Sequence, residues 1–399
     1  MSLELSSKAK KVKPSSTLAI TAKAKAMKAE GIDVVGFGAG EPDFDTPQYI
    51  KDAAIKAINE GFTKYTTASG TDELKKAVCE KELAYNHLQY APNQVVISNG
   101  GKHSLTNIFE AILNPEDEVI IPIPYWLTYP EIVKLADGVP VFIEGKKENG
   151  YKITASELEA AITDKTKALI LNTPSNPTGM IYSKEELEDI AEVVVRKDIY
   201  VVADEMYEYL VYEGNEHVSI ASLGDEIYKR TITCSGLSKS YAMTGWRIGY
   251  ACADAAIAKI MGSVQSHQTS NPNSIAQKAA FAAITGPQDS LYSMKDEFDK
   301  RRVYMYDRIK AMPLVDCAKP LGAFYCFIDF SNVIGKKYKG EVIDSAARVA
   351  EILIQDYSVA VVPCADFGSP ANIRLSYAIS IPTIEKGLDR IEEFLGILE

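Results

Sequence analysis

Short runs of β-branched and other apolar residues alternate with amphipathic segments through the middle of the chain. Such continuous apolar runs are typical of strands buried on both faces, and helices between them favour a mostly parallel sheet covered by helices. The sequence therefore predicts an α/β fold. The candidate strands are Val95–Ser98, Val119–Pro122, Ala168–Asn172, Ile199–Ala203, Thr231–Cys234 and Ile248–Cys252.

Helix signals support this interpretation and also set the two chain ends apart. Thr154 with Glu157, and Ser183 with Glu186, have the spacing of capping boxes. Further helices are expected at residues 17–30 (ending at Gly31), 290–312, 345–357 and 384–398, with short strands at Phe324–Asp329 and Ile373–Ser376.

These patterns predict two domains, within the range expected for 399 residues. The large domain is expected to span residues 48–290. A smaller domain is expected to be built from both ends of the chain, residues 1–47 and 291–399. A cleft between two domains is a common place for a small-molecule site.

The charge balance narrows the class of partner. The chain has 43 Lys and Arg against 54 Asp and Glu, a formal net charge of -11. Because an acidic protein repels phosphate backbones and anionic lipids, we expect no nucleic acid and no membrane partner. The N-terminal residues are polar and lysine-rich, unlike a secretory signal or a transit peptide, and no apolar stretch is long enough to span a membrane. A cytoplasmic location is the expectation.

Cysteine and histidine usage points away from disulfides and metals. The six cysteines are scattered with no CxxC pair, which is typical of a reduced, intracellular protein. The four histidines lie far apart in the sequence and form no HExxH motif. We therefore expect no metal site.

The stretch from Ser235 to Gly249 is the most informative part of the sequence. Lys239 follows a candidate strand and lies among small and hydroxylated residues. A lysine can form a Schiff base with an aldehyde once its ammonium loses a proton, and partial burial and the charge of Arg247 favour that loss. The guanidinium of Arg247 could also hold a phosphate. A surface lysine in a Gly/Ser loop is the alternative, but the pattern runs over 14 positions.

This stretch resembles the active-site signature of the class I pyridoxal-phosphate-dependent aminotransferases. The resemblance covers nearly the whole chain and is strongest to the bacterial and plant-plastid subgroup of aspartate aminotransferases. It implies a fold-type I transferase, with a mostly parallel seven-stranded sheet in the large domain and a small α+β domain. It also implies pyridoxal phosphate held by Lys239. The matching positions are Gly236, Ser238, Lys239, Ala242, Met243, Gly245, Arg247 and Gly249.

Two glycine-rich segments were compared with phosphate-binding motifs. A strand, a Gly-Gly turn and a helix at 103–113 could offer backbone N–H groups to a phosphate, and the resemblance gives this role to Gly101 and Lys102. It also implies that Ser238 and Arg247 bind the cofactor. The run from Gly36 fails as a dinucleotide fingerprint because its third glycine, Gly40, falls one position early. The resemblance implies instead that the Gly40 backbone lines the substrate site.

Three further residues receive cofactor roles from the resemblance. Asp204 ends a buried strand, where α/β folds bind ligands, and a carboxylate there would keep a pyridine nitrogen protonated; a helix N-cap is the alternative. Tyr207 and Asn176 would bond the cofactor's phenolic oxygen, and Asn176 also the substrate carboxylate, although its loop needs no function beyond turn formation. Trp126 would stack on the pyridine ring, with a core tryptophan as the alternative.

Two residues extend the site to substrate and partner. Arg374 lies in an apolar, strand-like run, where a charge needs a partner. The resemblance implies that it binds the substrate α-carboxylate with two parallel hydrogen bonds. Tyr65 matches a tyrosine that reaches the phosphate bound by a neighbouring subunit. The resemblance therefore implies a homodimer with shared active sites.

The sequence predicts an aminotransferase that moves an amino group from an L-amino acid, with aspartate first, to 2-oxoglutarate by ping-pong kinetics, with Lys239 as general base. The better-known aspartate enzymes bind the distal carboxylate with a dedicated arginine, for which no match is found. The candidates for that task are Ser15, Ser16, Thr17 and Lys102.

Three other functions are alternatives to this prediction. Aspartate/prephenate, aromatic or broad substrate use would keep the same reaction. Carbon–sulfur lyases and aminocyclopropane-carboxylate synthases share many of these motifs but catalyse a different one. A regulator built on this fold would need an added DNA-binding domain, for which the chain has no room.

Overall fold

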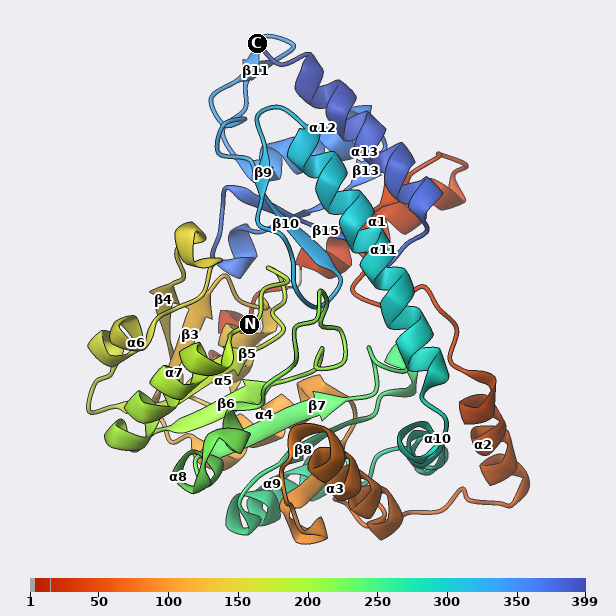
Figure 1. Ribbon diagram of the computed structural model, residues 1–399, viewed down its shortest axis with the longest axis vertical. Coiled ribbons are helices and arrows are strands. Elements are labelled where there is room, and N and C mark those ends of the chain that lie inside the picture. Colours follow the sequence, from red (N-terminus) through yellow and green to blue (C-terminus); the bar gives the residue numbers. More distant parts are fainter. Residues whose placement is uncertain (1–3, 15) are drawn as a thin grey trace.

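The computed structural model describes residues 4–14 and 16–399. Its largest feature is a seven-stranded sheet in the order β2-β8-β7-β6-β5-β3-β4 (Figure 1). Strands β4, β3, β5, β6 and β7 are parallel, whereas β8 runs antiparallel to both of its neighbours. This sheet confirms the predicted α/β fold. The strands are β2 Val95–Ser98, β3 Glu118–Ile123, β4 Val139–Glu144, β5 Thr166–Asn172, β6 Tyr200–Asp204, β7 Thr231–Gly236 and β8 Gly249–Cys252.

All six candidate strands are present, and the seventh, β4, carries no clear sequence signal. It lies at the edge of the sheet, where its residues alternate between exposed and half-buried. Pro140 interrupts its apolar run, which argues against a central strand but is tolerated at an edge, where one side of the backbone needs no partner.

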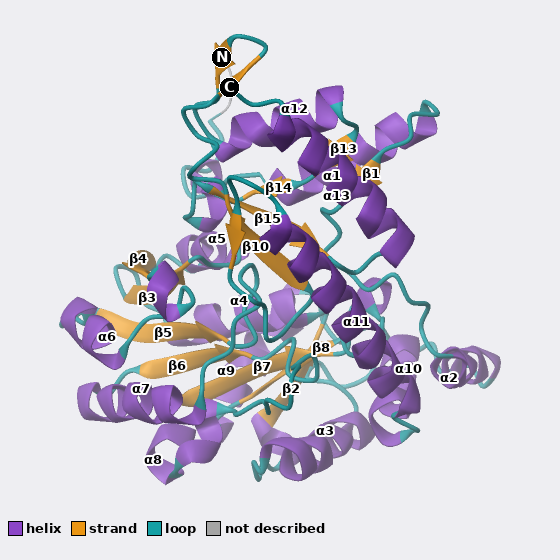
Figure 2. Cartoon of the chain, turned by 45° about the horizontal axis from the view of Figure 1, so that its top comes forward, coloured by secondary structure: helices purple, strands orange, loops and turns teal. Residues whose placement is uncertain are grey.

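Helices cover both faces of this sheet (Figure 2). Side chains of α4, α5 and α9 form one core cluster with the strands, and side chains of α6, α7 and α8 form another. Both predicted capping boxes are confirmed, at the starts of α6 and α7. The helices of this part are α2 Gln48–Asn59, α3 Asp72–Asn86, α4 Gly101–Ile112, α5 Thr128–Leu135, α6 Ala155–Ala161, α7 Lys184–Lys197, α8 Asp225–Tyr228, α9 Ala255–Gln268 and α10 Ser274–Thr285.

A smaller α+β part is built from the two chain ends. Its four-stranded antiparallel sheet has the order β14-β15-β10-β9, and β1 pairs with β13 to join the two ends of the chain. The four helices expected outside the central region are confirmed as α1, α11, α12 and α13. The elements are α1 Ser16–Ala29, β1 Val35–Gly36, α11 Asp289–Ala311, β9 Asp316–Cys317, β10 Tyr325–Asp329, β11 Lys337–Tyr338, β12 Glu341–Val342, α12 Ala346–Asp356, β13 Val359–Ala360, β14 Val362–Pro363, β15 Asn372–Ser376 and α13 Ile381–Gly396.

The two sheets meet at the loops that follow the parallel strands. Tyr207 and Leu210, just after β6, belong to the same core cluster as Tyr325 of β10 and Leu375 of β15. The carboxyl ends of parallel strands are where such folds bind ligands. The contact between the two sheets therefore falls where the predicted site lies, while the boundaries 48–290, 1–47 and 291–399 stay a prediction.

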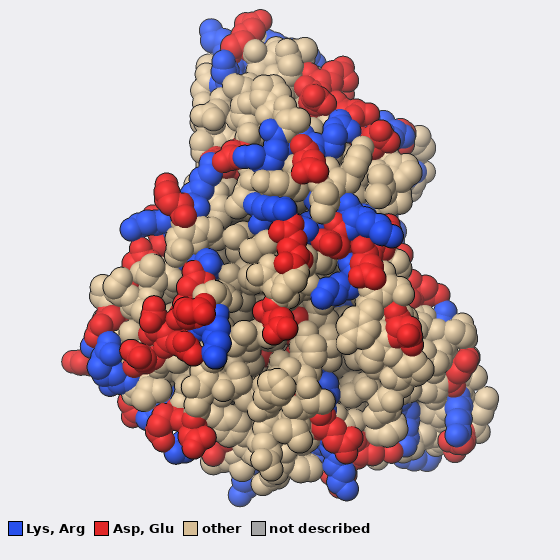
Figure 3. Space-filling model, in the orientation of Figure 1, with Lys and Arg blue, Asp and Glu red and all other residues tan. Residues whose placement is uncertain are grey.

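The hydropathy of the helices and the charges on the surface bear on the predicted absence of membrane and nucleic-acid partners. None of the helices in the described ranges combines the length and apolar character needed to cross a bilayer. On the face shown in Figure 3, acidic and basic side chains are interspersed. The cytoplasmic location and the absence of a nucleic-acid partner stay predictions.

Candidate active site

Lys239 lies in the loop that leaves β7, partly buried between the two sheets. Its Nζ donates a hydrogen bond to the carbonyl oxygen of Gly40, although the two residues are 199 positions apart in the sequence. The loop is closed by a bond from the Met243 N–H to the Ser238 carbonyl oxygen (3.2 Å). Lys239, Ser238 and Gly40 are therefore brought together, as the sequence predicts.

The surroundings of Lys239 favour its neutral amine. Burial lowers the pKa of Lys239 to about 8, and the positive charges of Arg374 and Arg247 act in the same direction. The carboxylates of Glu41 and Asp204 act against this shift without cancelling it. Near neutral pH a useful fraction of this side chain is the free amine that can attack a carbonyl or accept a proton.

Asp204 ends β6 and is 5% exposed. Its Oδ2 accepts a hydrogen bond from the Tyr129 hydroxyl (2.6 Å) and its Oδ1 accepts one from the Met206 N–H (3.2 Å). Burial raises the pKa of Asp204, and these two bonds oppose that rise. The structure thus holds a buried carboxylate in a fixed orientation, ready to stabilise a cation placed beside it.

Tyr129 was not predicted as a site residue. It lies on α5, three residues after Trp126, which precedes the helix, and the two rings pack edge to face with centroids 5.5 Å apart. Its closeness in the sequence to Trp126 was the available signal. The Trp126 ring in turn lies 5.0 Å from the Nζ of Lys102.

Arg374 of β15 is 2% exposed, yet its guanidinium is only partly satisfied. Nη1 donates to the Asn176 side-chain oxygen (2.7 Å), whereas Nε and Nη2 have no partner among the described residues. The ring of Tyr325 lies 4.3 Å from the guanidinium carbon, and the Tyr325 hydroxyl is 2.9 Å from that of Tyr207. Because buried donors are normally paired, two unpaired N–H groups indicate a place for an anionic ligand.

Tyr325 is the second residue that sequence reasoning missed. It reaches the site because β10 pairs with β15, bringing Tyr325 opposite Ser376. The two strands are far apart in the sequence, and strand pairing of this kind leaves no local pattern. An aromatic residue in an apolar strand reads only as core.

The turn between β2 and α4 forms a tight cradle. Helix α4 begins at Gly101, two residues earlier than expected, so Gly101 and Lys102 lie in its first turn, where N–H groups are unpaired. Gly100 has a φ of 87°, and a Cβ there would collide with the Arg247 guanidinium. A Cβ on Gly249 would collide with the Gly101 nitrogen. Helix start, glycines and two cations together fit a phosphate.

Three further predicted residues, Tyr65, Ser16 and Thr17, take no part in the hydrogen bonds of Lys239, Asp204 and Arg374 among the described residues. Tyr65 lies in the loop between α2 and α3 and is 91% exposed. Ser15 lies outside the described residues, and Ser16 and Thr17 begin α1 with side-chain oxygens that are buried without a hydrogen-bond partner among the described residues.

Comparison with known proteins decides the family. Residues 32–391 match the family model described as aminotransferase class I and II. The chain belongs to this family. The predicted recognition is therefore confirmed, and the reaction of this aminotransferase is the exchange of an amino group between amino acids and 2-oxo acids.

Individual relatives are similar to this chain over nearly its full length. The aminotransferase is 51% identical over 391 residues to an aspartate aminotransferase of Bacillus sp. (strain YM-2), with 98% of this chain and 99% of that protein covered. It is 46% identical over 387 residues to an aspartate/prephenate aminotransferase of Cereibacter sphaeroides, with 96% of each covered. The crystal structure of the aspartate aminotransferase from Rhizobium meliloti superposes with a TM-score of 0.96 at 42% identity, covering 100% of both chains. The predicted fold-type I transferase fold is confirmed.

Proposed function

We propose that this aminotransferase transfers the amino group of L-aspartate to 2-oxoglutarate, with pyridoxal 5'-phosphate bound at Lys239. The observation that carries the proposal is the buried Arg374 guanidinium, whose Nε and Nη2 have no partner among the described residues. Two parallel N–H donors match a carboxylate, the group that every amino acid and 2-oxo acid shares. The relatives named aspartate aminotransferases support the choice of aspartate.

The residues present fit the cofactor. The cradle of Gly101, Lys102 and Arg247 would hold the phosphate, and Asp204 would face the ring nitrogen. When bound, pyridoxal phosphate supplies an electron sink for the substrate's α-carbon. The other holding positions are those given by the family resemblance: Trp126 on the ring face, Tyr207 and Asn176 at the phenolic oxygen, and Ser238 and Lys239 in the loop after β7.

The chain's own groups account for the rest of the reaction. Arg374 and Asn176 hold the α-carboxylate, which fixes the orientation of the α-carbon. The pKa of the Lys239 amine is lowered to about 8. This amine removes the proton from the substrate's α-carbon and delivers it to the carbon on the other side of the transferred nitrogen. Because the first product leaves before the second substrate binds, the kinetics are ping-pong.

The distal carboxylate of aspartate needs a second cationic group. Lys102 stands in the first turn of α4, and its Nζ lies 5.0 Å from the Trp126 ring that would cover the substrate site. Loss of hydration and the charge of Arg247 lower the pKa of Lys102. A substrate carboxylate beside the phosphate would favour the charged form of this side chain. Ser16 and Thr17 could donate hydroxyl hydrogen bonds to the same group.

Tyr65 supports a homodimer with shared active sites. Its ring is 91% exposed, which is unusual for a large aromatic side chain in a chain with a well-packed core. In the dimer that we propose, a second copy of the chain receives this hydroxyl at its phosphate cradle.

Prephenate is a second candidate substrate, favoured by the Cereibacter sphaeroides relative. Initial rates with 2-oxoglutarate and aspartate, compared with glutamate and prephenate, test both. We expect oxaloacetate and glutamate in equal amounts from the first pair. Turnover of the second pair alone would replace aspartate with prephenate. Release of ammonia and pyruvate from an amino acid with a thiol leaving group on its β-carbon would indicate a carbon–sulfur lyase.

A further inference from the structure

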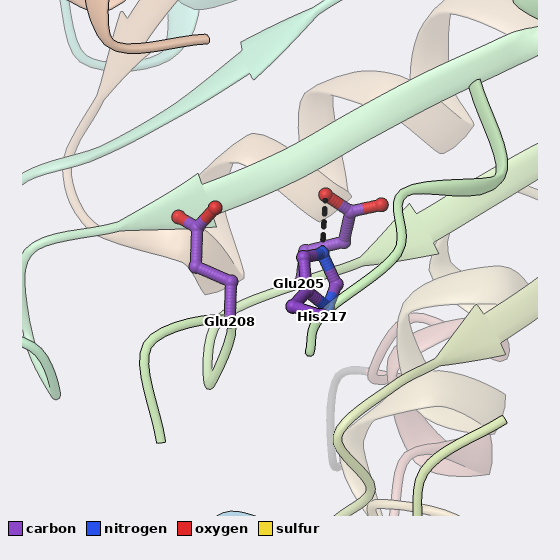
Figure 4. Close-up of side chains that lie close together, drawn as sticks. All are labelled: Glu205, Glu208 and His217. Carbon is purple, nitrogen blue, oxygen red and sulfur yellow. Dashed lines mark ion pairs between the residues drawn. The ribbon is translucent and has the colours of Figure 1, made fainter. Parts of the chain in front are cut away.

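A buried charged cluster follows Asp204 directly in the chain (Figure 4). It consists of Glu205, Glu208 and His217, whose side chains are at most 2% exposed. The His217 Nε2 lies 3.2 Å from a carboxylate oxygen of Glu205, and one ligand-type atom of each residue lies within 4.8 Å of the others. The histidine spacing in the sequence gave no indication of this cluster.

The two carboxylates have very different partners. Glu208 accepts hydrogen bonds from the Lys81 Nζ (2.5 Å), the Asn86 amide (3.0 Å) and the Ser235 hydroxyl (2.7 Å). The Glu205 carboxylate oxygens accept no hydrogen bond among the described residues, and their one ion pair there is with His217. Among the described residues, His217 is therefore the one group that pairs directly with the Glu205 carboxylate and can balance its charge.

A metal ion is the first alternative for this geometry. The oxygens of Glu208 are already engaged, and the ammonium of Lys81 sits 2.5 Å from one of them. Lys81 also lies 3.0 Å from Glu82 on the same helix, α3. A metal ion would have to bind beside the Lys81 ammonium, which already balances the charge of Glu208.

The cluster favours a protonated imidazole. Burial lowers the pKa of His217, but the charges of Glu205 and Glu208 raise it and outweigh burial and the opposing charge of Lys81, so the net shift is upward. The charged groups that face His217 are thus the two glutamates after β6 and Lys81 of α3.

The charge of Glu205 also reaches the cofactor site. It raises the pKa of its neighbour Asp204. A protonated Asp204 could not stabilise a cationic ring nitrogen. Whatever cancels the charge of Glu205 therefore helps to keep Asp204 ionised.

We propose that His217 is a positioning residue of the transamination site: it holds a proton against Glu205 and so keeps Asp204 ionised. This inference rests on the proposed role of Asp204 toward the cofactor. The cluster also reaches the catalytic loop, because Glu208 binds Ser235, four residues before Lys239.

The protonation state can be read without cofactor. The chain has four histidines, so the ¹⁵N spectrum of histidine-labelled, ligand-free protein is simple, and the signal lost in His217→Gln identifies His217. We expect both ring nitrogens to carry a proton at neutral pH. The stability that this ion pair contributes is fully present below the unfolded pKa of about 6.5 and is lost as the pH rises through the raised folded value. A neutral ring at neutral pH would overturn the proposal.

A double-mutant cycle separates charge from packing. His217→Gln leaves Glu205 charged and unpaired, and because a nearby like charge disfavours the ionised form of Asp204, we expect pyridoxal phosphate to bind on the order of ten-fold more weakly. Adding Glu205→Gln removes that charge and should restore affinity to near wild type. If the double variant binds as weakly as His217→Gln, charge is not the cause and the proposal fails.

Controls keep the two hypotheses distinguishable. Urea unfolding of each variant shows whether it is folded before affinity is compared. If the wild-type protein itself does not bind pyridoxal phosphate, the proposed function fails, whereas the protonation state of His217 in the spectrum is still measured independently.

Discussion

Lys239→Ala is expected to lower kcat/KM for transamination by about 10⁴-fold, the upper end of what a positioned general base contributes. The reason is that the Lys239 amine is the group whose pKa is lowered to about 8 by burial between Arg374 and Arg247. Initial-rate measurements with aspartate and 2-oxoglutarate check this. The protein should remain folded, because the hydrogen bond from Lys239 to the Gly40 carbonyl is the one such bond that its side chain makes among the described residues.

Lys239→Arg is the matched variant for this prediction. A guanidinium keeps the charge and much of the bulk but does not release its proton in the accessible pH range. We therefore expect Lys239→Arg to be as inactive as Lys239→Ala. Activity within ten-fold of wild type in either variant would contradict the assignment of Lys239.

Arg374→Leu is expected to lower kcat/KM for aspartate by about 10³-fold. Each hydrogen bond to a charged group contributes about 2 kcal/mol, and the substrate carboxylate would lose two of them. Arg374→Lys keeps the charge but offers no pair of parallel donors, so we expect about a 30-fold loss, equivalent to one such bond. Initial rates over a range of aspartate concentrations distinguish the two variants.

The control for Arg374 is cofactor binding. Lys239 and Asp204 stay intact in both variants, so both should still bind the cofactor and show its absorbance band. A variant that binds the cofactor normally and uses aspartate as well as wild type does would show that the carboxylate is held elsewhere.

Sequence patterns that involve only neighbouring residues predicted most of the strands and helices correctly. The central strands of the sheet are buried on both faces, so their apolar runs are easily recognised. The starts of α6 and α7 are each marked by a capping box, a motif only four residues long. Strand β4 lacks such a signal because an edge strand is half exposed and tolerates Pro140. The start of α4 was placed two residues late because glycines weaken a helical pattern.

Signals that depend on non-local contacts were missed. Tyr325 reaches Tyr207 and Arg374 through strand pairing, and His217 meets Glu205 through the path of a loop. Neither contact leaves a periodic pattern in the sequence. The family resemblance supplied Asn176 and Arg374, and the structure adds that the two bind each other and leave the guanidinium partly unpaired.

The absorbance spectrum of the purified protein supplied with pyridoxal phosphate tests the central claim most directly. We predict that aspartate alone abolishes the band of the protein-bound aldehyde form and produces that of the amine form, and that 2-oxoglutarate then restores the first band. That cycle requires a cofactor held by Lys239 and an amino group passed in two separate steps. A band that persists through aspartate and every other amino donor, or no band at all in the presence of the cofactor, would contradict the account.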